Sequence, residues 1–218
     1  EQAAEKIGAD PLLTRVGAQF HDIGKALNPT FFIENQIPGS VNTHQDDNPE
    51  EVAATIIRHV TDGVLLAKKH RLPRRLHDFI LEHHGTLITR YQYTQAMEAI
   101  GGDVTKVDIE KFRYPGPRPA SRESALLMLA DATEARARAE RPATDDDLRM
   151  LVQSVIETVQ KFNQLDDTLL TLRDLNLITE SFVTTLRGIY HPRIQYPNAK
   201  VPDQDSTMIS MRKENDKY

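Results

Sequence analysis

Six side chains that can bind metal ions stand out in this sequence because a helical reading of the chain brings them together. They are His21, Asp22, His59, His83, His84 and Asp131. The chain has no cysteine, so thiolate sites and disulfides are excluded and any metal must bind through histidine and carboxylate. This ligand set suits iron, manganese or zinc better than soft-metal or cluster chemistry.

Each of these side chains alone has an ordinary structural explanation. Asp131 on a buried face could form a salt bridge with an arginine, and His59 could be a core histidine with satisfied polar atoms. The double histidine could simply interact favourably with a helix C-terminus. Taken together with the first His-Asp pair, a metal centre with ligands from four helices is the more economical interpretation.

Six ligands are too many for one tetrahedral ion and suit two divalent transition-metal ions, iron or manganese, that share a bridging carboxylate. Two such ions, about 3.5–4 Å apart, can activate a water and hold the oxygens of a phosphoester. We expect Asp22 to be the bridge and thus catalytic. Lys25 follows one turn later, where its ammonium could bind and neutralise a phosphate oxygen. The alternative for Lys25 is a solvated lysine at a helix end.

Helical patterns place the ligands on buried faces. Pro11 follows the capping residue Asp10, and we expect a largely buried helix from there to about Ile23. Its apolar arc consists of Leu12, Leu13, Val16, Gly17, Phe20 and Ile23. A second helix should run from Pro49 to about 70, with His59 on its apolar stripe. A third should begin at Pro73 and present the double histidine at its C-terminus.

The rest of the chain also predicts helices and loops, so the expected class is all-α. Further helices are expected at 94–100, after a cap at Ser121, after a cap at Thr144, and before Pro192. Asp131 falls on an apolar face of the helix that Ser121 caps. Residues 28–48 read as a long ordered loop, and 197–218 as a polar tail.

The composition argues against two kinds of partner, duplex nucleic acid and a membrane that this chain would span. A net charge of −5 argues against nonspecific binding of duplex nucleic acid. The longest apolar run, near 125–130, is too short to span a bilayer. Glu1 begins within a helical pattern, which predicts that the chain is a piece of something longer. The sequence carries no signal for the oligomeric state.

Several longer motifs carry a family resemblance. In order, the chain contains HDIGK, NPTFFIENQ, IIRHVTDG, LPRRLHDFILEHHGT, FRYPGPRP, SALLMLADATEA and LRGIYHPRIQYP. Together these resemble the cytoplasmic HD domain of the seven-transmembrane HD family, the PgpH-type cyclic-di-AMP phosphodiesterases of the HD superfamily of metal-dependent phosphohydrolases. The match covers roughly Ala9 to Pro197.

The resemblance implies a helical HD-domain bundle over 1–196, a di-iron or di-manganese centre, and hydrolysis of cyclic-di-AMP to pApA. It assigns metal binding to His21, Asp22, His59, His83, His84 and Asp131. It also implies membrane helices ahead of this chain, which would make the chain the cytoplasmic domain of a bacterial inner-membrane protein. In the FRYPGPRP loop, we expect Arg113 and Tyr114 to contact phosphate or base. The alternatives are Tyr91, Tyr93 or Phe112 for the base and Arg118 for phosphate, or a packing role for the aromatic rings and contact with water alone for the arginines.

One feature departs from the family pattern, and three alternative functions stay open. The family's first histidine ligand would fall before Glu1, which leaves one ion short of a ligand unless His44 supplies it. A cyclic-di-GMP phosphodiesterase is one alternative, although Gly85-Thr86-Leu87 stands where its Gly-Tyr-Pro signature is expected. The others are a nucleotide triphosphohydrolase and a module that senses a dinucleotide without cleaving it.

Overall fold

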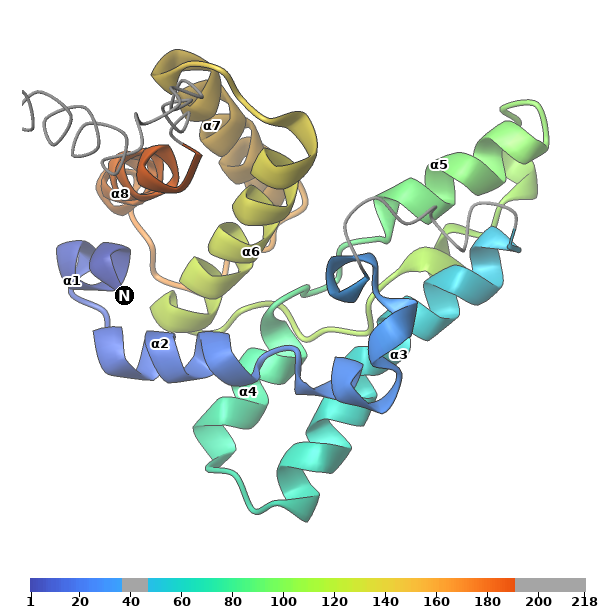
Figure 1. Ribbon diagram of the computed structural model, residues 1–218, viewed down its shortest axis with the longest axis horizontal. Helices are drawn as coiled ribbons and strands as arrows, with labels where there is room; N and C mark the ends of the chain where they lie inside the picture. The colour runs from blue at the N-terminus through green and yellow to red at the C-terminus, as the bar shows by residue number, and fades with distance from the viewer. Residues whose placement is uncertain (37–46, 191–218) are drawn as a thin grey trace, which may run out of the picture.

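The computed structural model describes residues 1–36 and 47–190, and this part of the chain is built from eight α-helices joined by loops and 3-10 turns (Figure 1). The α-helices are α1 (Gln2–Ile7), α2 (Pro11–Phe20), α3 (Pro49–Lys69), α4 (Arg74–Glu82), α5 (Arg90–Ala99), α6 (Arg122–Glu140), α7 (Asp145–Lys161) and α8 (Leu172–Tyr190). The 3-10 helices are η1 (Ile23–Leu27), η2 (Pro29–Phe31), η3 (Ile33–Asn35), η4 (Val104–Lys106) and η5 (Ile109–Phe112). Within the described ranges the only β-pairing is one isolated bridge, so the all-α prediction is confirmed.

Side-chain caps start α2, α6 and α7 where the sequence predicted them. The Asp10 carboxylate accepts a hydrogen bond from the backbone of Leu13 at 2.9 Å, one turn into α2. Ser121 and Thr144 each close a reciprocal capping box at the start of α6 and α7. These caps satisfy N–H groups that a helix start leaves unpaired. The local sequence therefore fixes the residue at which each of these helices begins. The starting residue in turn determines which side chains lie on the same face of the helix.

Three expectations about local structure were wrong in detail. α2 ends at Phe20, three residues before the expected Ile23, because the chain turns there into η1. α2 is also less buried than expected, since Leu12 is 68% exposed. α5 begins at Arg90, four residues before the expected Thr94. The expected tail, the domain boundary at 196 and His44 lie outside the described residues.

Two apolar clusters hold the helices together, and α6 belongs to both. The larger joins α1, α6, α7 and α8, and contains Leu126 and Leu129 of α6. The smaller contains Leu127 of α6 with two residues of α4, and side chains of α2 pack against it. Figure 1 shows α1, α6, α7 and α8 on one side, α3 and α5 on the other, and α2 with α4 between them. Within the described ranges, no helix is both long and apolar enough to cross a membrane.

The α3 side is joined to the end of α2 by a close approach of two backbones. Gly24 in η1 lies against α3, where a Cβ atom on it would be 1.9 Å from the carbonyl oxygen of His59. The same atom would lie 2.6 Å from the backbone nitrogen of Gly63, one turn further along α3. Only glycine lets the chain pass at this distance. This contact brings the His21-Asp22 turn beside His59.

We predict that Gly24→Ala destabilises the protein by about 2–4 kcal/mol, because the new methyl group would overlap backbone atoms that cannot move aside. The matched control is Gly188→Ala in α8, where a Cβ would meet nothing within 4 Å. That change should be neutral or stabilise by up to about 1 kcal/mol. Chemical denaturation of both variants measures this. Equal stabilities would contradict the close packing at Gly24.

Candidate metal centre

Four segments bring the six predicted ligands together, and the phase of each helix explains how. Asp131 lies one turn after Leu127 on the side of α6 that faces α2 and α4. His83 lies one turn after Phe79, whose ring packs on Gly17 of α2. His59 lies one turn before Gly63 on α3, and the His21-Asp22 turn follows α2 directly. Residues distant in sequence thus share one site.

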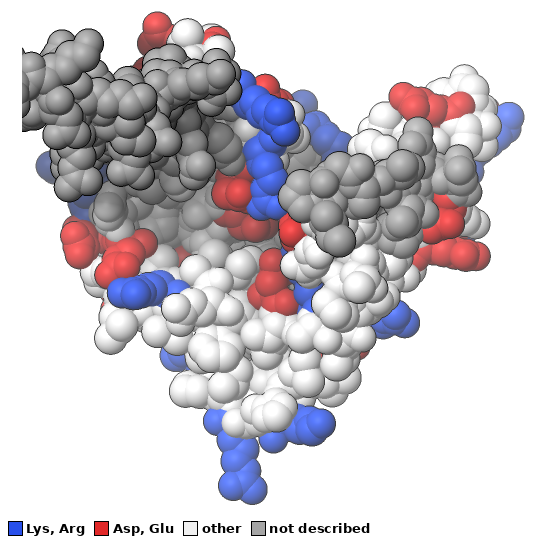
Figure 2. All heavy atoms as spheres, in the orientation of Figure 1, with Lys and Arg blue, Asp and Glu red and all other residues white. Residues whose placement is uncertain are grey.

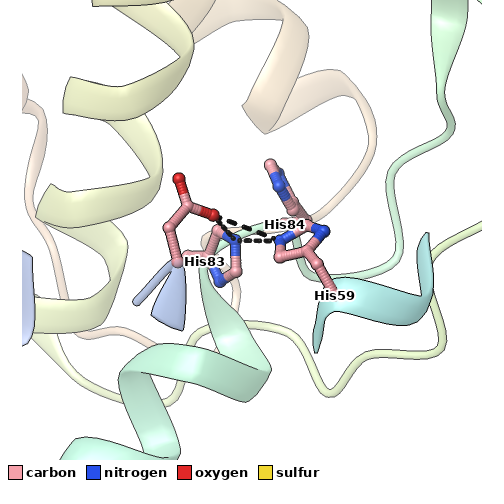
Figure 3. A group of neighbouring side chains, drawn as sticks. His59, His83 and His84 are labelled. Atoms are coloured by element: carbon pink, nitrogen blue, oxygen red, sulfur yellow. Dashed lines mark hydrogen bonds and ion pairs between the residues drawn. The ribbon is translucent and has the colours of Figure 1, made fainter. Parts of the chain in front are cut away.

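The first group of ligands consists of Asp22, His59, His83 and His84, whose candidate ligand atoms all lie within 4.8 Å of one another. Figure 3 shows the three imidazoles converging from the end of α4 and from α3. Asp22 Oδ1 lies 3.3 Å from His59 Nε2 and 3.6 Å from His83 Nε2. One carboxylate oxygen therefore faces two histidine nitrogens at once.

The second group contains His21, Asp22 and Asp131, again with ligand atoms within 4.8 Å of one another. His21 Nε2 lies 3.2 Å from Asp22 Oδ2 and 3.8 Å from Asp131 Oδ1. Asp22 thus belongs to both groups and presents a different oxygen to each. This is the arrangement that a carboxylate bridging two ions requires.

The histidines are oriented by their own helices. In His21, His59 and His83 the Nδ1–H donates to the backbone carbonyl three residues earlier, with N···O distances of 2.8, 2.5 and 2.9 Å. In the neutral ring, each bond leaves Nε2 as the nitrogen that carries the free lone pair. All three Nε2 atoms face Asp22. The rings are therefore set to donate lone pairs into the centre.

Metal ions fit this arrangement better than protein atoms alone. His59 Nε2 and His83 Nε2 lie 3.1 Å apart, although the Nδ1 bonds leave a lone pair on each. A proton between them is disfavoured, because burial and the nearby His21 charge lower the pKa of His83 to about 3. His21 Nε2 and Asp22 Oδ1 are buried without a hydrogen-bond partner. Cations would satisfy these atoms, and the donor set suits divalent metal.

The charges of the centre favour ionised carboxylates. Burial alone would raise the pKa of Asp22, but its close contacts with His21 and His59 hold that pKa far below the usual range. The pKa of Asp131 is also lowered, since His21 outweighs its burial. Burial lowers the pKa of His21, but the nearby carboxylates of Asp131 and Asp22 raise it to about 10, so a metal ion at Nε2 would replace the proton there. The carboxylates are therefore ionised at neutral pH and attract cations.

The centre is closed on one side and open on the other. The side chains of His59 and His83 are 1% and 0% exposed, whereas those of Asp22 and Asp131 are 29% and 30% exposed. The space-filling view shows a hollow between α6 and the α3–α5 side, with acidic side chains within it (Figure 2). A ligand can therefore reach the centre from the carboxylate side.

The residues expected to bind substrate lie in different settings. Lys25 Nζ is 2.8 Å from Asp22 Oδ2, at the open side of the centre. Tyr114 is buried and stacks on the ring of His84, with centroids 4.2 Å apart. Arg113 donates to the carbonyl of Thr86 and to the carboxylate of Glu110, each at 2.9 Å. Direct contact of Arg113 and Tyr114 with substrate stays a prediction.

Two acidic residues near the centre were missed in the sequence. Glu34 forms an ion pair with Lys25. Glu82 is buried and accepts hydrogen bonds from Ser124 Oγ at 2.5 Å and from the backbone of Ala120 at 3.0 Å, which ties α4 to the start of α6. Glu82 directly precedes the double histidine, and Glu34 lies in the NPTFFIENQ motif. Those positions were the only signals that could have pointed to them.

Comparisons with known proteins identify the family to which the fold belongs. A family model described as "HD domain" matches residues 1–136. The cyclic-di-AMP phosphodiesterase PgpH of Listeria monocytogenes is 37% identical over 200 residues, which cover 92% of this chain and 27% of the relative. The PgpH of Bacillus subtilis is 38% identical over 199 residues, which cover 91% of this chain and 27% of the relative. This chain therefore spans about a quarter of the length of these relatives.

A solved structure also matches. The crystal structure of the L. monocytogenes PgpH HD domain in complex with cyclic-di-AMP superposes with a TM-score of 0.80 at 35% sequence identity. The match covers 89% of this chain and 88% of the solved chain. The fold around the centre is thus shared with a domain that has been crystallised with that nucleotide.

We predict that Asp22→Asn lowers the occupancy of both metal ions, because Asp22 belongs to both ligand groups. Asp131→Asn should lower only the occupancy of the ion at the second group, to which Asp131 belongs. His59→Ala should lower only the occupancy of the ion at the first group. His70→Ala, an exposed histidine at the end of α3, is the control and should leave the metal content unchanged. Elemental analysis after reconstitution and desalting measures this. The assignment is wrong if Asp131→Asn and Asp22→Asn lose equal amounts of metal.

Proposed function

The chain belongs to the HD-domain family, and from this premise we propose that it hydrolyses cyclic-di-AMP to the linear dinucleotide pApA at a two-metal centre. The observation that carries the proposal is the pair of ligand groups that share Asp22. The substrate is proposed from the printed names of the relatives and from the nucleotide in the matching crystal structure.

Both ions of the proposed centre are iron or manganese. One would be held by Asp22, His59, His83 and His84, and the other by His21, Asp22 and Asp131. A donor set of imidazoles and carboxylates without thiolate suits either metal. When bound, such a pair supplies Lewis-acid chemistry, which activates a water nucleophile and neutralises charge on the phosphoryl group.

The chain's own residues orient the reaction. The Nδ1 hydrogen bonds of His21, His59 and His83 prevent ring rotation and keep every Nε2 directed inward. His59 and His83 are buried, whereas Asp22 and Asp131 are partly exposed, so a phosphodiester would approach from the side of these two carboxylates. Substrate charge would then meet Lys25, the nearest cation to Asp22 on that side in the described chain. Catalysis rests on positioning and charge stabilisation.

Lys25 is proposed to bind a non-bridging phosphate oxygen. Its Nζ is held 2.8 Å from Asp22 Oδ2, so a phosphate that reaches the centre would lie within its range. Tyr114, by stacking on His84, is proposed to hold the imidazole of His84 in its orientation. The phosphate or base contacts of Arg113 and Tyr114, and the cytoplasmic, membrane-tethered setting that the family resemblance implies, stay predictions.

The substrate prediction is tested with two nucleotides. We expect cyclic-di-AMP to be cleaved in preference to cyclic-di-GMP, because the relatives are named for the adenine compound and the chain lacks the Gly-Tyr-Pro segment after His84. Turnover of both in the presence of Mn²⁺, followed by chromatography of the products, measures the preference. Equal rates would overturn the substrate, and binding of cyclic-di-AMP without any cleavage would favour a sensing module.

The role of Lys25 is tested by Lys25→Ala. Loss of a cation that stabilises phosphoryl charge should lower turnover by about 10²–10³-fold. The melting temperature should change little, because the ammonium lies on the open side of the centre and not in either apolar cluster. Lys68→Ala, at the distant end of α3, provides the control. If Lys25→Ala instead unfolds the protein, the residue is structural.

A further inference from the structure

The Glu-Asn-Gln run at 34–36 belongs to an arm that folds back on itself beside the centre. The arm consists of residues 29–36, which include η2 and η3 and follow η1. The side-chain amide of Asn35 donates to the carbonyl of Pro29 at 3.1 Å, and that of Gln36 donates to the carbonyl of Thr30 at 3.1 Å. These two bonds close the arm into a compact loop. They therefore fix where the third side chain, Glu34, points.

Glu34 points at Lys25. The Lys25 ammonium lies between two carboxylates, with Asp22 on the metal side and Glu34 on the arm side. Phe32 of the same arm lies beneath the ammonium, with Nζ 5.3 Å from the ring centroid, and the Phe32 ring also meets the ring of His59 edge-on at 6.0 Å. The arm thus contacts the lysine from two directions while resting on a ligand of the centre.

Metal binding would affect the charges of the Asp22 and Glu34 carboxylates differently. Asp22 would share its charge with two divalent ions, so it would attract Lys25 less, and the ions would repel the ammonium. Glu34 belongs to neither ligand group, and its charge stays available. Within the described ranges, no carboxylate other than these two is in ion-pair contact with Lys25. Glu34 is then the group that keeps the lysine in place.

We propose that Glu34 is a positioning residue that holds the Lys25 ammonium over the loaded centre, where it meets a phosphate oxygen of the substrate. This rests on the phosphodiesterase function proposed above. Glu34 acts through Lys25 and not on the substrate itself. Its loss therefore matters only while Lys25 is present.

A double-mutant cycle tests this dependence. Glu34→Gln, which keeps the shape and removes the charge, should lower kcat/KM for cyclic-di-AMP by about tenfold, in the range of couplings between contacting residues. In a Lys25→Ala background the same substitution should have no further effect. Glu98→Gln, an exposed glutamate of α5, is the matched control and should leave both backgrounds unchanged.

A binding measurement separates this from a general loss of activity. The Kd of a phosphorothioate analogue of cyclic-di-AMP that resists cleavage, measured by calorimetry, should weaken in Glu34→Gln and show the same dependence on Lys25. Metal content and melting temperature should stay at the parent values. If Glu34→Gln lowers the melting temperature, Glu34→Asp, which keeps the charge, replaces it in the cycle and should recover part of the affinity.

The outcomes are distinct. Equal effects of Glu34→Gln with and without Lys25 would overturn the inference, as would no effect in either background. Failure of the underlying function looks different, because the parent protein itself would then neither cleave cyclic-di-AMP nor bind the analogue.

Discussion

The structure depends on the close passage of the chain at Gly24 across α3. A side chain there would overlap the backbone of His59, so the absence of a Cβ decides how near the end of α2 can lie to α3. Asp22, two residues before this contact, is thereby held within 3.3 Å of His59. Gly63 leaves the matching space on α3, and the side chain of Ile80 of α4 also packs against it. The double histidine begins three residues after Ile80. A backbone contact thus sets the geometry of the ligands.

The electrostatics of the centre show what that geometry is for. Without bound metal, this geometry costs free energy. The imidazole lone pairs of His59 and His83 face one another, and one buried carboxylate oxygen of Asp22 has no hydrogen-bond partner. The two apolar clusters that share α6 stabilise the fold in which these contacts occur. Bound cations would turn the same unfavourable contacts into ligand bonds. The same unpaired polar atoms therefore make the metal-free site unfavourable and make it suitable for cations.

Much of the site could be predicted from sequence because it depends on helix phase. Caps such as Ser121 fix where a helix begins, and a regular helix then determines that Asp131 shares a face with Leu127. What could not be predicted depends on contacts between distant segments. The early end of α2 follows from the approach of Gly24 to α3, and the role of Glu34 follows from the folded arm of η2 and η3. Neither leaves a periodic signal.

The most direct test of a two-metal centre bridged by Asp22 is anomalous diffraction from crystals of the protein grown with manganese, with data collected on both sides of the manganese absorption edge. We expect two anomalous peaks about 3.5–4 Å apart. One would lie among Asp22, His59, His83 and His84, and the other beside His21 and Asp131, with a different Asp22 oxygen directed at each. A single peak, or two peaks that Asp22 does not join, would contradict it.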